Sequence, residues 1–189
     1  MTAIDQKLLD ALATLDTPTV CNALEEIDPK HRDRGFTTAP LVCPFPGLKP
    51  IVGFARTAMI RAMRPGMPAG PEKRVSYYEY VSKGDLPRIS VIQDLDGANV
   101  GYGAFWGEVN SNVHKALGAL GVVTDGCIRD IPDWAPGFQA LAGSIKPSHA
   151  HVHMVDFGVQ VSVAGMVVDH DDLVHADQHG AVVIPKDLA

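Results

Sequence analysis

The chain has 189 residues, of which 46% are hydrophobic and 20% are charged, and its formal net charge is −6. This length suits a single domain over residues 1–189, and the composition excludes a fibrous or broadly disordered protein. Lysines and arginines are scattered along the chain, which argues against a nucleic-acid partner.

The cysteines and the N-terminus bear on where the protein works. Cys21, Cys43 and Cys127 form a sparse, odd-numbered set that suits a reducing compartment better than a disulfide framework. The N-terminus does not resemble a signal peptide, and no apolar run approaches the roughly 20 residues of a membrane helix. We therefore expect a cytoplasmic protein with no membrane partner.

The first half of the chain predicts helices joined by proline-rich loops. Helices are indicated by apolar residues at helical spacing and by Thr17-Pro18, interpreted as an N-cap followed by proline at the first helical position. Long loops in compact domains are often functional or buried on a partner subunit. The predicted segments are a helix over 4–14, a helix from Thr17 to near Asp28, a loop over 29–50, a strand over 51–60, a loop over 63–72 and a helix over 72–83.

The second half predicts strands that alternate with helices and then a strand-rich end. This order favours a layered α/β domain without internal repeats. The predicted segments are a strand over 89–92, a glycine-containing loop over 95–107, a helix over 108–117, a strand over 121–124, a turn at Asp125-Gly126, a short helix from Pro132, and strands over 140–145, 149–157, 160–168 and 181–184.

Residues 106–110, Trp-Gly-Glu-Val-Asn, open the helix predicted over 108–117. Glycine lets the backbone approach a ligand closely, and the free N–H groups of a helix start attract a carboxylate. Arg129 follows Glu108 after twenty intervening residues, a gap that one helix and one strand can span. The helix start and the strand end can therefore lie side by side.

The side chains at these two places suggest a chemistry. Arg129 can clamp a carboxylate or an oxo group with its planar fork of donors. Asp130 is a hard oxygen ligand that suits Mg²⁺ or Mn²⁺, and Glu108 can hold a metal-bound water or move a proton. Each piece also has an ordinary reading, because an Arg-Asp dipeptide is usually a surface pair and a glycine before a helix is usually a turn.

Two sets of alternating residues are further metal candidates. His149, His151 and His153 would share one face of a strand and could bind zinc or copper, although polar lining of an interface or cavity is the favoured interpretation. His175, Asp177 and His179 alternate in a turn-like stretch. Gly101-Tyr102-Gly103 does not form a dinucleotide fingerprint.

Residues 118–130, Gly-Ala-Leu-Gly-Val-Val-Thr-Asp-Gly-Cys-Ile-Arg-Asp, resemble the signature of the RraA-like family. That family is named for a regulator of ribonuclease activity. It also includes class II aldolases that act on 4-hydroxy-4-methyl-2-oxoglutarate and 4-carboxy-4-hydroxy-2-oxoadipate. The likeness extends from the Thr17 helix to residues 180–185. It implies an α/β/β/α-type sandwich of the swivelling phosphohistidine-domain-like kind, assembled as a homotrimer or hexamer with sites between subunits.

The resemblance also implies roles for individual residues. The aldolase pattern of an acidic residue, twenty residues and Arg-Asp becomes Glu108 followed by Arg129-Asp130, and Asp133 matches a further acidic position. The backbone of Gly107, Glu108, Val109 and Asn110 would hold a pyruvyl carboxylate. Arg129 would bind the oxo group and steady an enolate. Asp130 would bind the metal, with Glu108 and Asp133 as the other acidic groups around it.

Two features depart from the aldolase pattern. Glu108 stands where the aldolases usually have Asp, and no C-terminal helical tail follows Ala189. Three hypotheses follow, of which the first is a metal-dependent lyase acting on a small oxo-acid. The second is a non-catalytic RraA-like regulator, and the third is a metal enzyme with an unrelated substrate on the same scaffold.

Overall fold

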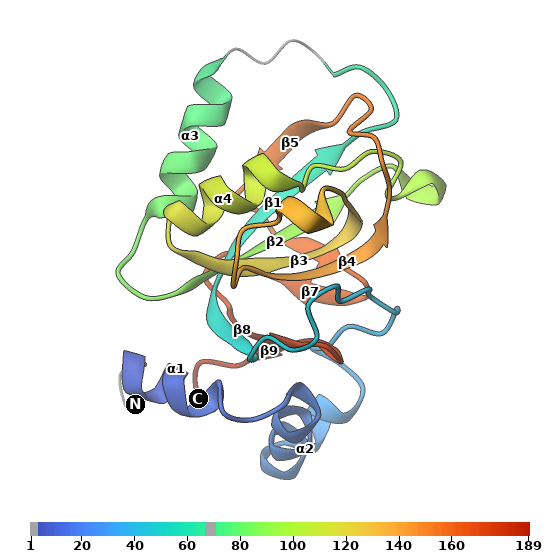
Figure 1. Ribbon diagram of the computed structural model, residues 1–189. Coiled ribbons are helices and arrows are strands. Elements are labelled where there is room, and N and C mark those ends of the chain that lie inside the picture. The colour runs from blue at the N-terminus through green and yellow to red at the C-terminus, as the bar shows by residue number, and fades with distance from the viewer. Residues whose placement is uncertain (1–3, 67–70) are drawn as a thin grey trace.

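The structure, a computed structural model, describes residues 4–66 and 71–189. Figure 1 shows how its helices and strands are arranged. In chain order these are α1 (Gln6–Leu12), α2 (Thr17–Ile27), the 3₁₀ helix η1 (Pro29–Arg32), β1 (Ile51–Arg61), α3 (Pro71–Ser82), β2 (Arg88–Asp94), η2 (Gly97–Asn99), α4 (Glu108–Ala116), β3 (Ala119–Ile128), η3 (Ile131–Asp133), β4 (Gln139–Ile145), β5 (His153–Phe157), β6 (Val161–Val163), β7 (Met166–Val168), β8 (Leu173–Asp177) and β9 (Gly180–Ile184).

The long strand β1 organises the main sheet, whose order is β4-β3-β2-β1-β8-β9. Strands β1 to β4 run parallel to one another. Along its other edge, β1 pairs first with β8 through residues 51–54 and then with β5 through residues 58–61, both antiparallel. Because β1 to β4 are parallel, their carboxyl ends share one edge of the sheet, where open α/β sheets usually bind ligands.

The elements stack in layers around this sheet (Figure 1). Helices α3 and α4 cover one face, the β6–β7 hairpin packs on the other, and α1 and α2 lie beneath β8 and β9. Successive residues of a strand point to opposite faces. Accordingly, Ile89 and Val91 of β2 join the core on the hairpin side, whereas Ile92 joins the core under the helices. The layered α/β prediction is confirmed.

Most predicted elements are present with ends shifted by a few residues. The Thr17 N-cap prediction is wrong, because the Asp16 carboxylate caps α2 by accepting from the Thr19 N–H at 2.8 Å. Thr17 is instead the first helical residue, and its N–H donates to Asp177 at 3.0 Å. The 29–50 loop is largely as predicted, apart from η1 and two isolated bridges to β9 and β4.

The strands differ from the predictions at three places. Asp125-Gly126 is not a turn: it lies inside β3, where the register against β4 shifts between Thr124 and Cys127. The strand-like stretch over 160–168, in which Gly165 is predicted to be a turn or bulge position, is the hairpin β6–β7, which turns at Ala164-Gly165. Strand β8 was not predicted. Within the described residues, no helix has the length and apolar character needed to cross a membrane.

Candidate functional site

The start of α4 and the end of β3 lie side by side, as their spacing predicts. Trp106 forms a parallel bridge with Ile128, and the Arg129 N–H donates to the Trp106 carbonyl at 3.0 Å. These contacts bring Gly107 and Glu108 next to Arg129 and Asp130. We name residues 107–110 with Arg129 and Asp130 the Asp130 corner.

Gly107 has an extended backbone (φ −169°) that any residue could adopt, so its backbone conformation does not require glycine. What requires glycine here is the space that its missing side chain leaves. A Cβ added at Gly107 would collide with the Asp130 carboxylate and lie 3.2 Å from Arg129 Cγ. Asp130 itself has left-handed backbone angles (φ 55°, ψ 41°), which an aspartate tolerates better than most residues. The glycine and this unusual backbone together let a carboxylate sit directly against the helix start.

The Asp130 carboxylate has two weak partners in the corner. Its Oδ2 lies 3.4 Å from the backbone nitrogen of Glu108 and 3.5 Å from Nε of Arg129. The side chains of Arg129 and Asp130 are 35% and 34% exposed. Both charged groups therefore remain accessible to a ligand.

The first turn of α4 supplies unused donors. Among the described residues, nothing accepts a hydrogen bond from the backbone N–H of Val109 or Asn110, whereas the Ser111 N–H bonds to the Gly107 carbonyl at 3.0 Å. Glu108 is exposed, and Val109 is 67% exposed. Free N–H groups at a helix start favour an anion, so this turn can receive a carboxylate.

A buried polar network holds α4 in place from below. The Asn110 side chain donates to the Phe105 carbonyl and accepts from the Tyr78 hydroxyl at 3.3 Å. His114 Nδ1 donates to the Asn110 carbonyl at 2.7 Å, and His114 Nε2 lies 2.9 Å from the Tyr77 hydroxyl. Burial lowers the pKa of His114 to about 4, so the ring is neutral near pH 7.

This network was not predicted from the sequence. Its only sequence signal is the spacing of Asn110 and His114, four residues apart on one helix face. Because the Asn110 side chain is taken up by the fold, the part of Asn110 that remains for a ligand is its backbone N–H. Trp106 is fully buried and belongs to the core.

The predicted metal ligands Glu108, Asp130 and Asp133 do not form a three-ligand cluster. No three His, Cys, Asp or Glu side chains within residues 4–66 and 71–189 are grouped closely enough to hold an ion. Asp133 is exposed, and its N–H donates to the Asp130 carbonyl at 3.1 Å. Mg²⁺ is usually bound by one or two carboxylates plus waters and substrate. The half-buried, accessible Asp130 carboxylate and its acidic neighbours are consistent with such a site.

The histidines at 149, 151 and 153 do not share a strand face, so that prediction is wrong. Only His153 belongs to β5, and Ala150 turns the chain with φ 45°. His149 Nδ1 donates to the Ala150 carbonyl at 2.7 Å, and His153 Nδ1 donates to the His151 carbonyl at 2.8 Å.

His175 and Asp177 tie the N-terminal helices to β8. His175 is buried, lies 3.0 Å from the Thr17 hydroxyl, and points Nε2 at the carbonyls of Leu12 and Leu15. Asp177 accepts from the Thr17 N–H. These bonds satisfy the polar groups within the fold. The turn-like stretch predicted here is partly a strand, because His175 and Asp177 belong to β8 and only Gln178-His179 form the turn.

The fold and the site together define a class of protein. It is a layered α/β domain in which an Arg-Asp pair lies beside the start of a helix. The sequence profile of the RraA-like family, described as Aldolase/RraA, matches residues 17–183, and the chain belongs to this family. The family includes aldolases as well as regulatory inhibitors.

One relative with a similar sequence is protein MJ0644 of Methanocaldococcus jannaschii. It is 35% identical over 86 residues, which cover 44% of this chain and 41% of that protein. The chain thus matches about two fifths of that relative's length.

Solved structures with a similar fold match nearly the whole chain. RraAS2 of Streptomyces coelicolor, described as an unusual member of the RNase ES inhibitor RraA protein family, is 24% identical with a TM-score of 0.74, over 99% of this chain and 88% of that one. A Pseudomonas syringae pv. tomato protein is 23% identical with a TM-score of 0.76, over 99% and 80%. A structure described under novel cellulases from gut-associated microbes is 15% identical with a TM-score of 0.83, over 99% and 81%. At these identities the likeness shows the fold alone.

Proposed function

We propose that the chain is a divalent-metal-dependent lyase that breaks a carbon–carbon bond in a pyruvate-derived oxo-acid. The observation that carries this proposal is the meeting of the α4 start with Arg129-Asp130, fixed by the Arg129 bond to the Trp106 carbonyl. That meeting puts anion-binding N–H groups, a guanidinium and a carboxylate within one corner. A 2-oxo acid offers a carboxylate and an adjacent oxo group, which match these partners.

The substrate is bound by the backbone and by Arg129. The free N–H groups of Val109 and Asn110 bind the carboxylate of the pyruvyl unit. The Arg129 fork binds the adjacent oxo group and stabilises the negative charge that develops on its oxygen as the enolate forms. The neutral His114 below keeps the first turn of α4 in position through its bond to the Asn110 carbonyl.

Glu108 is the proton-transfer group for aldol cleavage. Its exposed carboxylate takes the proton of the C4 hydroxyl, the C3–C4 bond breaks, and the electron pair enters the enolate of pyruvate. Protonation at C3 then gives pyruvate, while C4 becomes the carbonyl of the second product. With oxaloacetate, the same C3–C4 bond breaks with loss of CO₂, and no hydroxyl proton has to be removed.

Asp130 is the residue that would hold Mg²⁺ or Mn²⁺, with Glu108 and Asp133 as the other acidic groups of the proposed site. A bound ion of this kind polarises the substrate oxo group as a Lewis acid. The side chains of Arg129 and Asp130 are 35% and 34% exposed, so the Asp130 corner is open to solvent. We propose that a neighbouring subunit of a homotrimer or hexamer closes it, which native mass spectrometry would test.

The decisive experiment measures pyruvate release from oxaloacetate and from 4-hydroxy-4-methyl-2-oxoglutarate, with Mg²⁺ or Mn²⁺ added. Asp130→Asn keeps a residue type that tolerates the left-handed backbone while removing the charge. We expect it to lower kcat/KM by about a hundredfold, the scale of losing one stabilising group. The exposed Asp187→Asn is the matched control and should retain full activity.

Other outcomes would contradict the proposal. Pyruvate release that is unchanged in Asp130→Asn would place the chemistry elsewhere. If wild type released no pyruvate with either ion and bound neither by isothermal titration calorimetry, the non-catalytic regulator would be the better reading of the family membership.

A further inference from the structure

A second hollow lies at the carboxyl end of β1, away from the Asp130 corner. It has a volume of about 450 Å³ and is lined by Arg61, Met63, Arg64, Pro65, Leu95, Asp96, Gly97 and His153. We name it the Arg61 pocket. We propose that it binds a small oxyanion carrying two negative charges, through a phosphate group or a pair of carboxylates.

The backbone around the pocket is firmly held. Asp96 Oδ2 accepts from the backbone N–H groups of Ala62 and Met63 at 2.6 and 2.8 Å. The Leu95 N–H bonds to the Ile60 carbonyl at 2.9 Å. Asp96 thereby fixes the end of β1, and its carboxylate oxygen is used by these donors rather than by an arginine.

The two arginines of the pocket lack compensating carboxylates. Neither Arg61 nor Arg64 forms an ion pair or a side-chain hydrogen bond with any residue in 4–66 or 71–189. The sequence of residues 67–70, Met-Pro-Ala-Gly, contains no acidic residue. Two guanidinium groups thus line one hollow in a chain whose net charge is −6.

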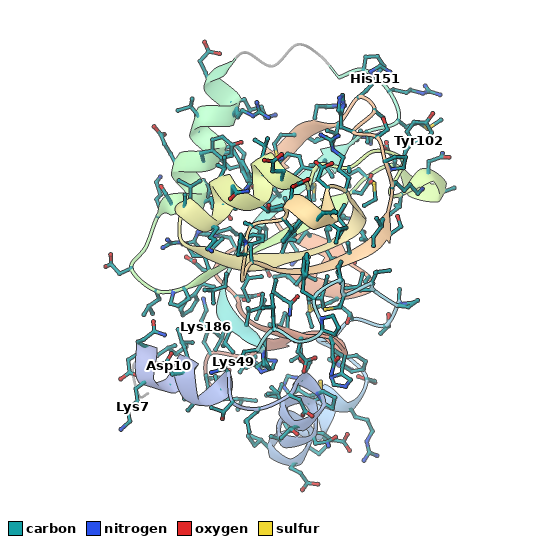
Figure 2. The ribbon with its side chains drawn as sticks, in the orientation of Figure 1. Lys7, Asp10, Lys49, Tyr102, His151 and Lys186 are labelled. Atoms are coloured by element: carbon teal, nitrogen blue, oxygen red, sulfur yellow. The ribbon has the colours of Figure 1, made fainter. Side chains whose placement is uncertain are left out.

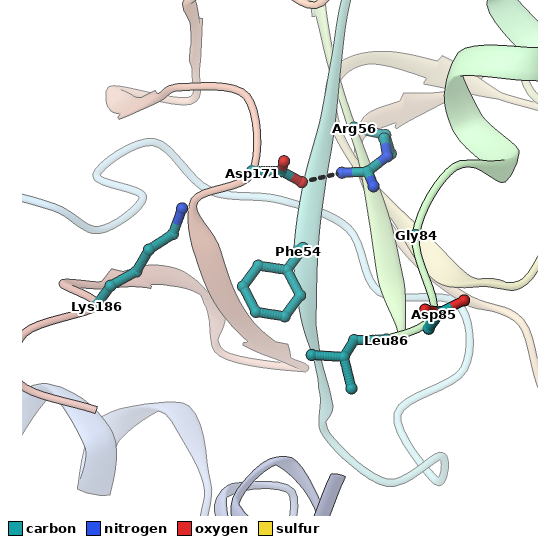
Figure 3. Close-up of a pocket in the computed structure, with 7 residues that line it drawn as sticks. All are labelled: Phe54, Arg56, Gly84, Asp85, Leu86, Asp171 and Lys186. Carbon is teal, nitrogen blue, oxygen red and sulfur yellow. Dashed lines mark hydrogen bonds and ion pairs between the residues drawn. The ribbon is translucent and has the colours of Figure 1, made fainter. Parts of the chain in front are cut away.

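Arg56 shows what a structurally used arginine looks like in this protein. In the hollow drawn in Figure 3, its guanidinium pairs with Asp171 and donates to the Lys83 carbonyl at 2.5 Å. Its side chain is only 5% exposed. The guanidinium of Arg56 is bonded within the fold, whereas Arg61 and Arg64 are exposed and have no such partners among the described residues.

His153 forms one side of the pocket at a defined place. It is the cross-strand partner of Arg61 in the β1–β5 pair, and the His151 N–H bonds to the Ala62 carbonyl at 3.0 Å. Because Nδ1 donates to the His151 carbonyl, Nε2 is the ring nitrogen left without a partner in the described part of the chain. A Cβ at Gly66 would collide with this ring, so Gly66 packs closely against it.

The chemistry of the lining selects the ligand class. With one carboxylate already bonded to backbone donors, two guanidinium groups give the pocket a positive charge that repels metal ions. Planar guanidinium forks match the oxygens of phosphate and carboxylate groups. The His151 N–H bonds to the Ala62 carbonyl next to the pocket, so the label of His151 in Figure 2 marks the pocket's end of the molecule, far from Lys7 and Lys186.

The test is calorimetric titration of the full chain with inorganic phosphate and, separately, with malonate at constant ionic strength. We expect saturable binding by wild type that is weakened about tenfold or more in Arg61→Gln and in Arg64→Gln. Arg74→Gln, an exposed arginine of α3, is the matched control and should bind as wild type does. The tighter of the two anions tells whether a phosphate group or a dicarboxylate is the natural chemistry.

Three results would overturn the assignment. The first is the absence of saturable binding of either anion by wild type, and the second is equal binding by Arg64→Gln and wild type. The third is loss of binding in Arg129→Gln, which would move the anion to the Asp130 corner. The thermal midpoint of each variant shows that it is folded. Since the readout is binding alone, failure of the lyase proposal leaves this test intact.

Discussion

The Asp130 corner and the Arg61 pocket lie at the carboxyl ends of two strands of the same parallel array, yet they use aspartate in opposite ways. At the end of β3, Asp130 Oδ2 has only long contacts, at 3.4 and 3.5 Å. At the end of β1, Asp96 Oδ2 accepts two short bonds from backbone N–H groups. At Asp96 the backbone donors, rather than an arginine, occupy the bonded carboxylate oxygen, whereas the loosely held Asp130 carboxylate stays available to a cation.

Gly107→Ala should break the Asp130 corner most severely. The new Cβ would occupy the position of the Asp130 carboxylate, so the carboxylate must move away from the helix start. We expect lyase activity to fall by about a thousandfold, the upper range for losing a positioned charge-stabilising group. Phosphate binding at the Arg61 pocket should be unchanged.

Gly47→Ala is the matched control, because a Cβ there meets nothing within 4 Å and the residue does not have a positive φ. It should leave steady-state pyruvate release unaltered. Full activity in Gly107→Ala would show that the close approach of Gly107 and Asp130 has no part in the chemistry.

Arg129→Lys tests the Asp130 corner by keeping the positive charge and removing the planar guanidinium fork. A lysine cannot make the paired, planar contacts that an arginine makes with an oxo group and its neighbour. We expect kcat/KM for oxaloacetate to fall by about a hundredfold. A variant with wild-type kinetics would mean that only charge is needed at this position.

Protonation of His114 should weaken the fold beneath the Asp130 corner. Burial lowers the pKa of His114 from 6.5 to about 4, so between these values the unfolded chain binds more protons than the folded chain. Stability contributed by this residue is therefore present above pH 6.5 and is lost as the pH falls toward 4. The difference between pH 7 and pH 5 should be about 2 kcal/mol.

Urea unfolding of wild type and His114→Gln at both pH values isolates this contribution. Asp125 acts in the opposite direction, since burial raises its pKa to about 6 and its contribution falls as the pH rises from 3.8 to 6. Subtracting the pH dependence of His114→Gln from that of wild type cancels the contribution of Asp125, because both proteins contain Asp125. Identical pH dependence in the two proteins would contradict the neutral, buried state of His114.

Asp96→Asn should produce the smallest effect, confined to the Arg61 pocket. Asparagine keeps an acceptor oxygen, but it weakens two charge-assisted bonds to the Ala62 and Met63 N–H groups. We expect a loss of about 1 kcal/mol in the free energy of unfolding, with lyase activity unchanged. Unaltered stability in urea would show that Asp96 does not fix the end of β1.

The sequence predicts the Asp130 corner well because one helix and one strand connect its two halves. The Arg61 pocket was not predicted, since Arg61 and His153 meet only through the β1–β5 pairing, whose register shifts between Met59 and Ile60. No local pattern encodes that long-range register. The alternation of His149, His151 and His153 predicts a shared strand face, but the turn at Ala150 breaks it.

Two further errors have physical causes. The Asp125-Gly126 pair has the composition of a turn, yet β3 continues through it, because its pairing with β4 resumes at Cys127 after a shift of register, whereas its pairing with β2 ends at Thr124. Strand β8 contains His175 and Asp177, polar residues that suit a buried strand only because Thr17 and the α1–α2 connection satisfy them. Those partners lie at the other end of the sequence.

The double pairing of β1 has a consequence for how the chain emerges during synthesis. One edge of β1 stays unpaired until β5 and β8, close to the C-terminus, are available to cover it. A nascent chain arrested before β5 would expose that apolar strand edge, which is a template for pairing with other chains. Completion of the sheet is therefore a late event, and incomplete chains should be prone to aggregate.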